Sequence, residues 1–120
     1  MIANYKTIYQ HLRQEGYDVY SVGQHKGICS SPYIVIRNAG TVTELSVSQT
    51  DYELLLYYPM DHYSEFEEYI DTVRDTMNAL YPGLKLADDS SEHYLDEDVR
   101  AYQASLVYRT YSASKANRLT

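Results

Sequence analysis

Apolar positions along the chain follow two spacings, one typical of helices and one typical of strands. The first segment predicts a short N-terminal helix, because its apolar residues recur at steps of three and four. These residues are Ile2, Tyr5, Ile8, Tyr9 and Leu12. Gly16 follows them and suits the left-handed backbone position that closes a helix. The chain is therefore expected to open with one short amphipathic helix that ends near Gly16.

The segment from Tyr52 to Leu80 gives the clearest pattern. Tyr52–Tyr58 predicts a strand with three consecutive leucines, and Pro59 ends it because proline cannot donate to a strand ladder. A long helix is expected next, with Ser64 as N-cap and Glu67 completing a capping box. Its buried face is predicted to hold Phe66, Ile70, Val73, Met77 and Leu80.

Three more strands are expected from β-branched and aromatic runs, at Tyr17–Val22, Tyr33–Arg37 and Val99–Tyr111. Leu84–Ala87 is compatible with a brief strand, and the weakly alternating segment Thr41–Thr50 with either a β-arm or a polar loop. The predicted fold is α+β, in the order α-β-β-β-α-β-β. A mostly antiparallel sheet of about four strands packs against one long and one short helix. Residues 1–111 form a single domain and 112–120 a flexible tail.

Composition and charge argue against several classes of function and cellular location. The formal net charge of −7 argues against specific nucleic-acid binding, which needs Lys and Arg to displace counterions from phosphates. One cysteine, Cys29, excludes an internal disulfide and fits a reducing compartment. The chain has no apolar run long enough to span a membrane and no signal-peptide core at its start, so a cytoplasmic protein is expected. The chain has fifteen tyrosines, which suit partly hydrated interfaces because each has an apolar ring and a polar hydroxyl.

The chain shows no catalytic set. Its four histidines stand in four separate segments without metal-ligand spacing, and Cys29 has no visible partner base. The acidic run Asp88–Asp98 lacks the spacing and the glycine of a calcium-binding loop. We therefore predict no enzyme activity, no cofactor and no metal.

The order of these blocks resembles the tail-terminator and head-to-tail joining proteins of long-tailed bacteriophages and prophages. The segments that carry the likeness are SPYIVIR, YELLLYYP, the helix EFEEYIDTVRDTMNAL and the terminal strand RAYQASLVYRTY. The resemblance implies a structural virion protein at the tail–head junction, made in the host cytoplasm. It would form a ring, usually a hexamer, that caps the tail tube and joins it to the head connector. The implied partners are other copies of the chain, the tail-tube protein and the head connector or neck protein.

Two other functions stay open: a different phage neck or tail component, such as a tube or completion protein, and a small stand-alone α+β binding domain. The candidate interface residues lie in two polar segments. One is the arm Thr41–Thr50, whose apolar residues have no obvious place in a core. The other is the acidic run, where two apolar residues interrupt the carboxylates. These candidates are Val42, Leu45, Val47, Asp88, Asp89, Tyr94, Leu95 and Asp96.

Overall fold

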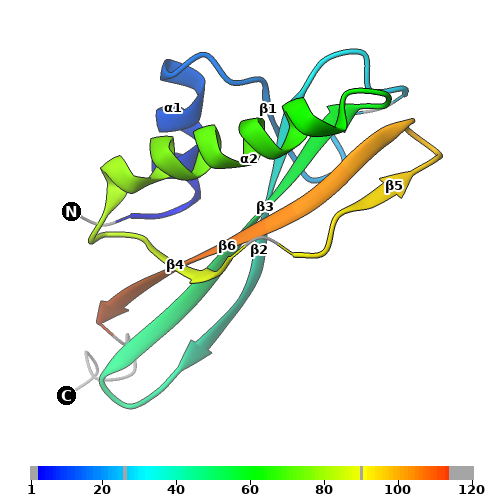
Figure 1. Cartoon of the computed structure of the whole chain (residues 1–120). Coiled ribbons are helices and arrows are strands. Elements are labelled where there is room, and N and C mark those ends of the chain that lie inside the picture. The colour runs from blue at the N-terminus through cyan, green and yellow to red at the C-terminus, as the bar shows by residue number, and fades with distance from the viewer. Residues whose placement is uncertain (1–2, 26, 90, 114–120) are drawn as a thin grey trace.

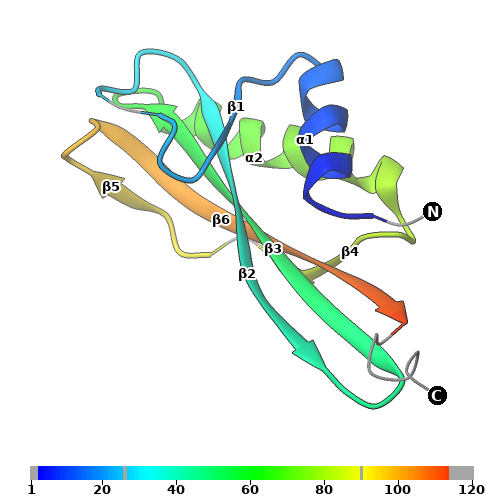
Figure 2. The ribbon, with the colours of Figure 1, turned by 180° about the vertical axis from the view of Figure 1, so that it is seen from behind.

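The computed structural model describes residues 3–25, 27–89 and 91–113. It is a two-layer α+β protein in which both α-helices of these ranges lie on one face of a twisted sheet (Figure 1). Of those two helices, neither combines the length and the apolar character needed to cross a membrane. The opposite face of the sheet carries no helix in the described part of the chain (Figure 2).

The first helix, α1 (Tyr5–Gln14), begins at a capping box that the sequence analysis missed. The Asn4 side chain accepts from the Thr7 backbone N–H, and the Thr7 hydroxyl accepts from the Asn4 N–H. Gly16 ends this segment with φ of 91°, the left-handed conformation that was predicted for it. Ile8 and Leu12 point from α1 into the core and are fully buried.

The second helix, α2 (Tyr63–Met77), continues into a short 3₁₀ turn, η1 (Asn78–Leu80). Its predicted start was wrong: His62 is the N-cap, no side chain caps the helix, and Ser64 lies inside the first turn. The ring of Tyr63 packs against Phe66 and Tyr102, which draws Tyr63 into the helix. The predicted buried face is confirmed residue by residue, from Phe66 to Leu80.

The sheet corrects the predicted fold class. Among the described residues it has six strands rather than about four. They are β1 (Val19–Ser21), β2 (Tyr33–Thr43), β3 (Val47–Pro59), β4 (Lys85–Asp88), β5 (Tyr94–Asp96) and β6 (Ala101–Ala113). Their spatial order is β1-β2-β3-β6-β4, with β5 also paired to β6. The protein is α+β, but the predicted sheet and element order were wrong.

Two physical features explain the difference. The loop after β1 carries the chain back to the same end of the sheet before β2 begins. The two strands therefore run in the same direction, β1 pairs with β2 in parallel, and the sheet is mixed. A strand also forms inside the acidic run, because Tyr94, Leu95 and Asp96 pair with Gln103, Tyr102 and Ala101 of β6. Charged residues lower strand propensity, so this short strand leaves little trace in the sequence.

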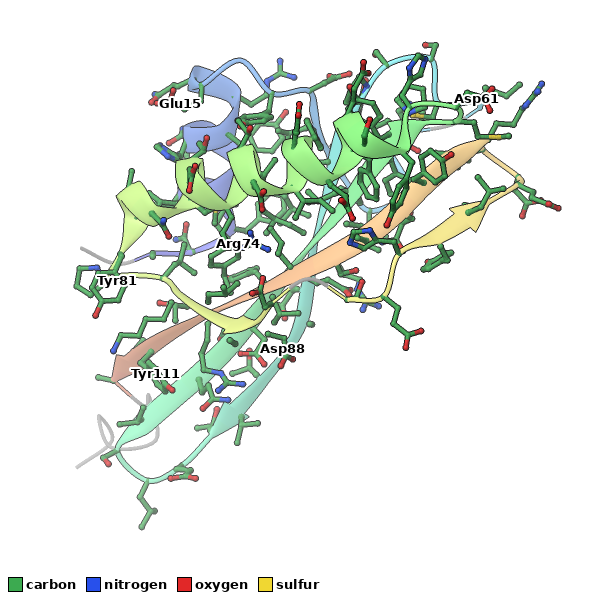
Figure 3. All side chains as sticks on the ribbon, in the orientation of Figure 1. Glu15, Asp61, Arg74, Tyr81, Asp88 and Tyr111 are labelled. Atoms are coloured by element: carbon green, nitrogen blue, oxygen red, sulfur yellow. The ribbon has the colours of Figure 1, made fainter. Side chains whose placement is uncertain are left out.

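The core lies between the helices and one face of β2, β3 and β6. Leu54 of β3 sits opposite Leu106 of β6 and Ile36 of β2, and all three are buried. Arg74 of α2, labelled in Figure 3, donates to Asp71 of the same helix and to Asp89 at 2.7 Å each, and the bond to Asp89 fastens the helix to the segment after β4. Alternate residues of the same three strands point to the uncovered face.

Beyond the helices, the outer parts of β2, β3 and β6 continue as a three-stranded arm, and the molecule is 57 Å long but only 26 by 24 Å across (Figure 2). The sequence left two alternatives open for segment 41–50, a β-arm and a polar loop, and the structure shows a β-hairpin there. A bulge interrupts the β2–β3 register between Asn38 and Gly40, where Gly40 has φ of 124°. Ser112 and Ala113, predicted to begin a tail, belong to β6. Residues 114–120 of that tail lie outside the described residues.

Candidate functional site

The uncovered face of the sheet carries rows of side chains that run across the strands. In an antiparallel pair, residues directly opposite each other point to the same face. One row therefore joins Tyr33 of β2, Tyr57 of β3, Gln103 of β6 and Tyr94 of β5. The next row joins Val35, Leu55 and Ser105, and the one after it begins with Arg37 and Glu53. These rows form the floor of a hollow of about 750 Å³, called the groove below.

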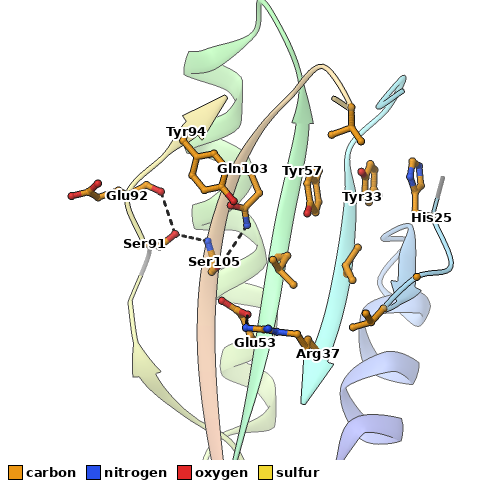
Figure 4. Close-up of a pocket in the computed structure, with 15 residues that line it drawn as sticks. His25, Tyr33, Arg37, Glu53, Tyr57, Ser91, Glu92, Tyr94, Gln103 and Ser105 are labelled. Carbon is orange, nitrogen blue, oxygen red and sulfur yellow. Dashed lines mark hydrogen bonds and ion pairs between the residues drawn. The ribbon is translucent and has the colours of Figure 1, made fainter. Parts of the chain in front are cut away.

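Aromatic rings stand side by side along one half of the groove. The ring centroids of His25 and Tyr33 are 3.7 Å apart, and those of Tyr33 and Tyr57 are 4.7 Å apart, with the planes within 13° of parallel in both pairs. Tyr94 lies across Gln103 from this stack (Figure 4). Tyr57 thus has one ring face covered by Tyr33 and the other directed along the groove toward Gln103 and Tyr94.

Backbone hydrogen bonds hold the two sides of the groove in place. On the β6 side, the Ser91 N–H donates to the Ser105 carbonyl at 3.0 Å, and the Ser105 N–H donates to the Ser91 hydroxyl oxygen at 2.8 Å (Figure 4). Near the aromatic end, the Cys29 N–H donates to the Val99 carbonyl at 2.7 Å. The Ser91 loop is therefore anchored to β6, and near the aromatic end the loop of Cys29 is tied to the turn that precedes β6.

Polar groups on the groove floor are largely paired with one another. Gln103 is almost fully buried, and its Nε2 donates to the Ala104 carbonyl at 3.1 Å and to the Ser105 hydroxyl at 3.2 Å. Arg37 and Glu53 form a cross-strand ion pair at the end of the groove nearest the arm. Farther along, Arg109 donates to both carboxylate oxygens of Asp51. The groove thus ends at the Arg37–Glu53 ion pair, and the Arg109–Asp51 pair lies beyond it.

The electrostatic environment of the groove is negative. Burial raises the pKa of the Tyr57 hydroxyl, and Asp96 and Glu53 raise it further. Burial also raises the pKa of Tyr33, with a smaller contribution from Asp96. Burial is the largest cause for both phenols, and the nearby carboxylates add to it because they disfavour a second negative charge.

The candidate residues named from sequence fall into two distant groups. Val42, Leu45 and Val47 lie at the tip of the arm, and Leu45 is the most exposed of them at 82%. All three stand apart from the groove, and Val42 and Val47 line a small hollow together with Tyr111.

The acidic-run candidates lie at the other side of the sheet. Asp88 ends β4, Asp89 pairs with Arg74, and Leu95 is exposed on β5. Of this set, Tyr94 lines the groove itself, and Asp96 acts on its tyrosines through charge. Sequence reasoning missed Tyr33, Tyr57, Gln103 and His25, because only the strand register brings them together.

A reactive thiol or a bound metal ion would be needed for two common kinds of catalysis at such a site. Burial raises the pKa of the Cys29 thiol to about 11, so the thiol is protonated near neutral pH and a poor nucleophile. Across the described residues, no three His, Cys, Asp or Glu side chains gather in a way that could hold a metal ion.

Comparison with known proteins identifies the fold alone. No protein-family model matches the chain, and no curated protein matches it. Among solved structures, the chain is similar to the core region of PilO from the type IV pilus system of Pseudomonas aeruginosa, with a TM-score of 0.52. The match covers 89% of this chain and 92% of that chain, at 10% sequence identity.

This finding overturns the resemblance to phage tail terminators. The structural neighbour reported above is a pilus protein, and no family model of a phage protein matches the chain. The segments that suggested the likeness, such as YELLLYYP and its following helix, are patterns of strand and helix. Such patterns recur in unrelated α+β proteins and carry no functional residue, so they could not identify a family.

Proposed function

We propose that this chain is a non-enzymatic binding module that holds a partner protein on the uncovered face of its sheet. The observation that carries the proposal is the groove itself, with half-buried Val35, Leu55 and Tyr57 on the floor and Tyr94 at the side. Tyrosine is enriched where protein surfaces meet, because its ring supplies contact area and its hydroxyl stays hydrated. PilO, with its similar fold, comes from a pilus system, and a role in a protein assembly agrees with that likeness.

Three exposed tyrosines make a matched test of this proposal. Tyr94 lies in the groove, Tyr81 lies after η1 away from it, and Tyr111 lies on the arm. Each can be replaced by the photo-crosslinking residue benzoylphenylalanine, one ring for another, in cells that naturally contain the protein. Position 94 should yield one adduct of discrete mass after irradiation, and position 81 should yield none.

A further change separates specific from chance adducts. Leu55→Asp places a charge on the groove floor without touching the core side of β3, so it should abolish the adduct at position 94. Adducts of equal yield at positions 94 and 81, or a position-94 adduct that survives Leu55→Asp, would contradict the proposal.

A second candidate function is self-assembly through the arm. It is favoured by Val42, Leu45 and Val47, which expose apolar surface at the tip of a projecting hairpin. Sedimentation velocity of the wild type and of Leu45→Asp, over a hundredfold range of concentration, tests it. A concentration-dependent oligomer that Leu45→Asp dissolves would support self-assembly, and a wild-type monomer throughout would reject it. The ring, its hexameric stoichiometry and the phage partners remain predictions without support from these comparisons.

A further inference from the structure

Carboxylates outnumber cationic groups around the groove. Glu92 lines its side with its carboxylate directed outward (Figure 4), and Glu53 lies at its end. Asp96 lies outside the lining and contributes to the raised pKa of both groove tyrosines. Arg37 is the cation that lines the groove among the described residues, and its charge is matched by Glu53. A positive group entering the groove therefore meets unbalanced negative charge.

The tyrosine rings add to this preference. An aromatic ring has a negative face, so a guanidinium or ammonium group within about 6 Å of the ring centre is attracted to it. One face of Tyr57 is stacked on Tyr33, and the other is directed toward Gln103 and Tyr94. The electron-rich rings and the carboxylates thus favour the same kind of ligand.

The size of the groove limits what it can hold. About 750 Å³ lies within the range of pockets that enclose one small ligand. The floor crosses β2, β3, β6 and β5 (Figure 4), and the groove residues Tyr94, Glu92 and Arg37 are exposed. A short stretch of extended chain fits such a site, whereas a folded domain could contact only its rims.

From this combination we infer that the groove binds a short, extended, basic segment of a partner protein, with an arginine or lysine side chain seated between Tyr57 and Tyr94. Apolar residues that alternate with the basic ones contact Val35 and Leu55. The carboxylates of Glu92 and Asp96 stabilise the bound cation. This inference rests on the proposed function and specifies the chemistry of its partner.

Fluorescence anisotropy with three dye-labelled peptides tests the inference. The probes are Gly-Arg-Val-Arg-Val-Arg-Gly and its counterparts with glutamate or glutamine in place of arginine, all with blocked ends. The arginine peptide should bind at least tenfold more tightly than the glutamine peptide, and the glutamate peptide should bind most weakly.

A pair of double variants separates the groove from the overall charge. Glu92→Gln with Asp96→Asn removes two carboxylates at the groove, and Glu68→Gln with Asp75→Asn removes two from the exposed side of α2. Each groove carboxylate should contribute about fivefold, the effect of unit charges about 4 Å apart in water. The α2 pair should change binding less than twofold, because charges beyond about 8 Å are screened at physiological salt.

Tyr57→Leu keeps the apolar volume and removes the ring, so it should weaken arginine-peptide binding about two- to fivefold and leave glutamine-peptide binding unchanged. Unchanged melting temperatures of all variants would confirm that they fold.

The outcomes separate this inference from the proposed function. Equal binding of all three peptides, or equal losses from the groove and α2 double variants, overturns the basic segment while the crosslinking result still stands. Absence of peptide binding together with absence of a crosslink at position 94 rejects both. A position-94 adduct at twice the mass of the chain identifies a second copy as the occupant, and this also overturns the inference.

Discussion

Leu54 and Leu55 are adjacent on β3 but belong to opposite faces of the sheet. Leu54 is fully buried against the helices, whereas Leu55 is half-buried on the groove floor. Replacing each with alanine removes the same atoms from two environments. The pair therefore measures how differently the two faces contribute to stability.

The expected magnitudes follow from burial. Leu54→Ala leaves a cavity among Ile36, Leu106 and the helices, and should cost about 2–5 kcal/mol of unfolding free energy. Leu55→Ala should cost about 1 kcal/mol, since part of its side chain is already hydrated. A domain of this size has roughly 5–15 kcal/mol in total, so the first change removes a large share.

Urea denaturation followed by circular dichroism gives both free energies from one experiment. Each variant is compared with the wild type at two protein concentrations tenfold apart. The slope of free energy against urea should stay constant, because the surface exposed on unfolding hardly changes. The melting temperature of Leu54→Ala should fall by about 10 °C or more.

Equal costs for the two substitutions would refute the reasoning, because the groove floor would then be as well packed as the core. A cost for Leu55→Ala that grows with protein concentration would show that another copy covers the groove. A small, concentration-independent cost supports an open groove in the free protein.

Three further predictions concern other parts of the molecule. Val73→Asp should leave the protein unfolded by circular dichroism, because it places a charge at a fully buried position of α2, and a soluble variant with wild-type melting would contradict this. Asn4→Ala should lower stability by about 1 kcal/mol in urea titrations through loss of the α1 capping box, whereas Asn4→Asp should retain most of it. The pKa of Cys29 is raised to about 11, so its contribution to stability is present below pH 9 and lost as the pH rises toward 11. Cys29→Ala should therefore make the fall in stability over that range less steep in urea titrations at successive pH values, and an unchanged slope would argue against the shift.

The faces of the long strands could be predicted from sequence because alternation is local. In β3, alternation along the sequence puts Leu54 and Leu56 on one face and Leu55 and Tyr57 on the other, as the structure places them. The buried face of α2 was predictable for the same reason, from its three- and four-residue steps.

The groove could not be predicted, because it depends on pairing between distant segments. Tyr33 and Tyr57 become neighbours through the register of β2 on β3, and Gln103 joins them through β6. A shift of one residue in either register would send these side chains to the other face. Tyr94 was a candidate because it interrupts the acidic run. The strand that positions it, β5, could not be recognised from sequence because the acidic residues around it have low strand propensity.

The bulge at Asn38 and Gly40 has a consequence for solubility. β1 pairs with β2 at Ile34–Ile36, so among the described residues the outer edge of β2 from Arg37 to Thr43 has no strand beside it. Such an edge can template the growth of cross-β aggregates. The bulge breaks its regular ladder, and the Asn38 side chain, which accepts from the Gly40 N–H at 2.8 Å, holds that irregular geometry in place. The same irregularity therefore makes the arm a poor seed for amyloid-like stacking, and an arm without the bulge would be a better one.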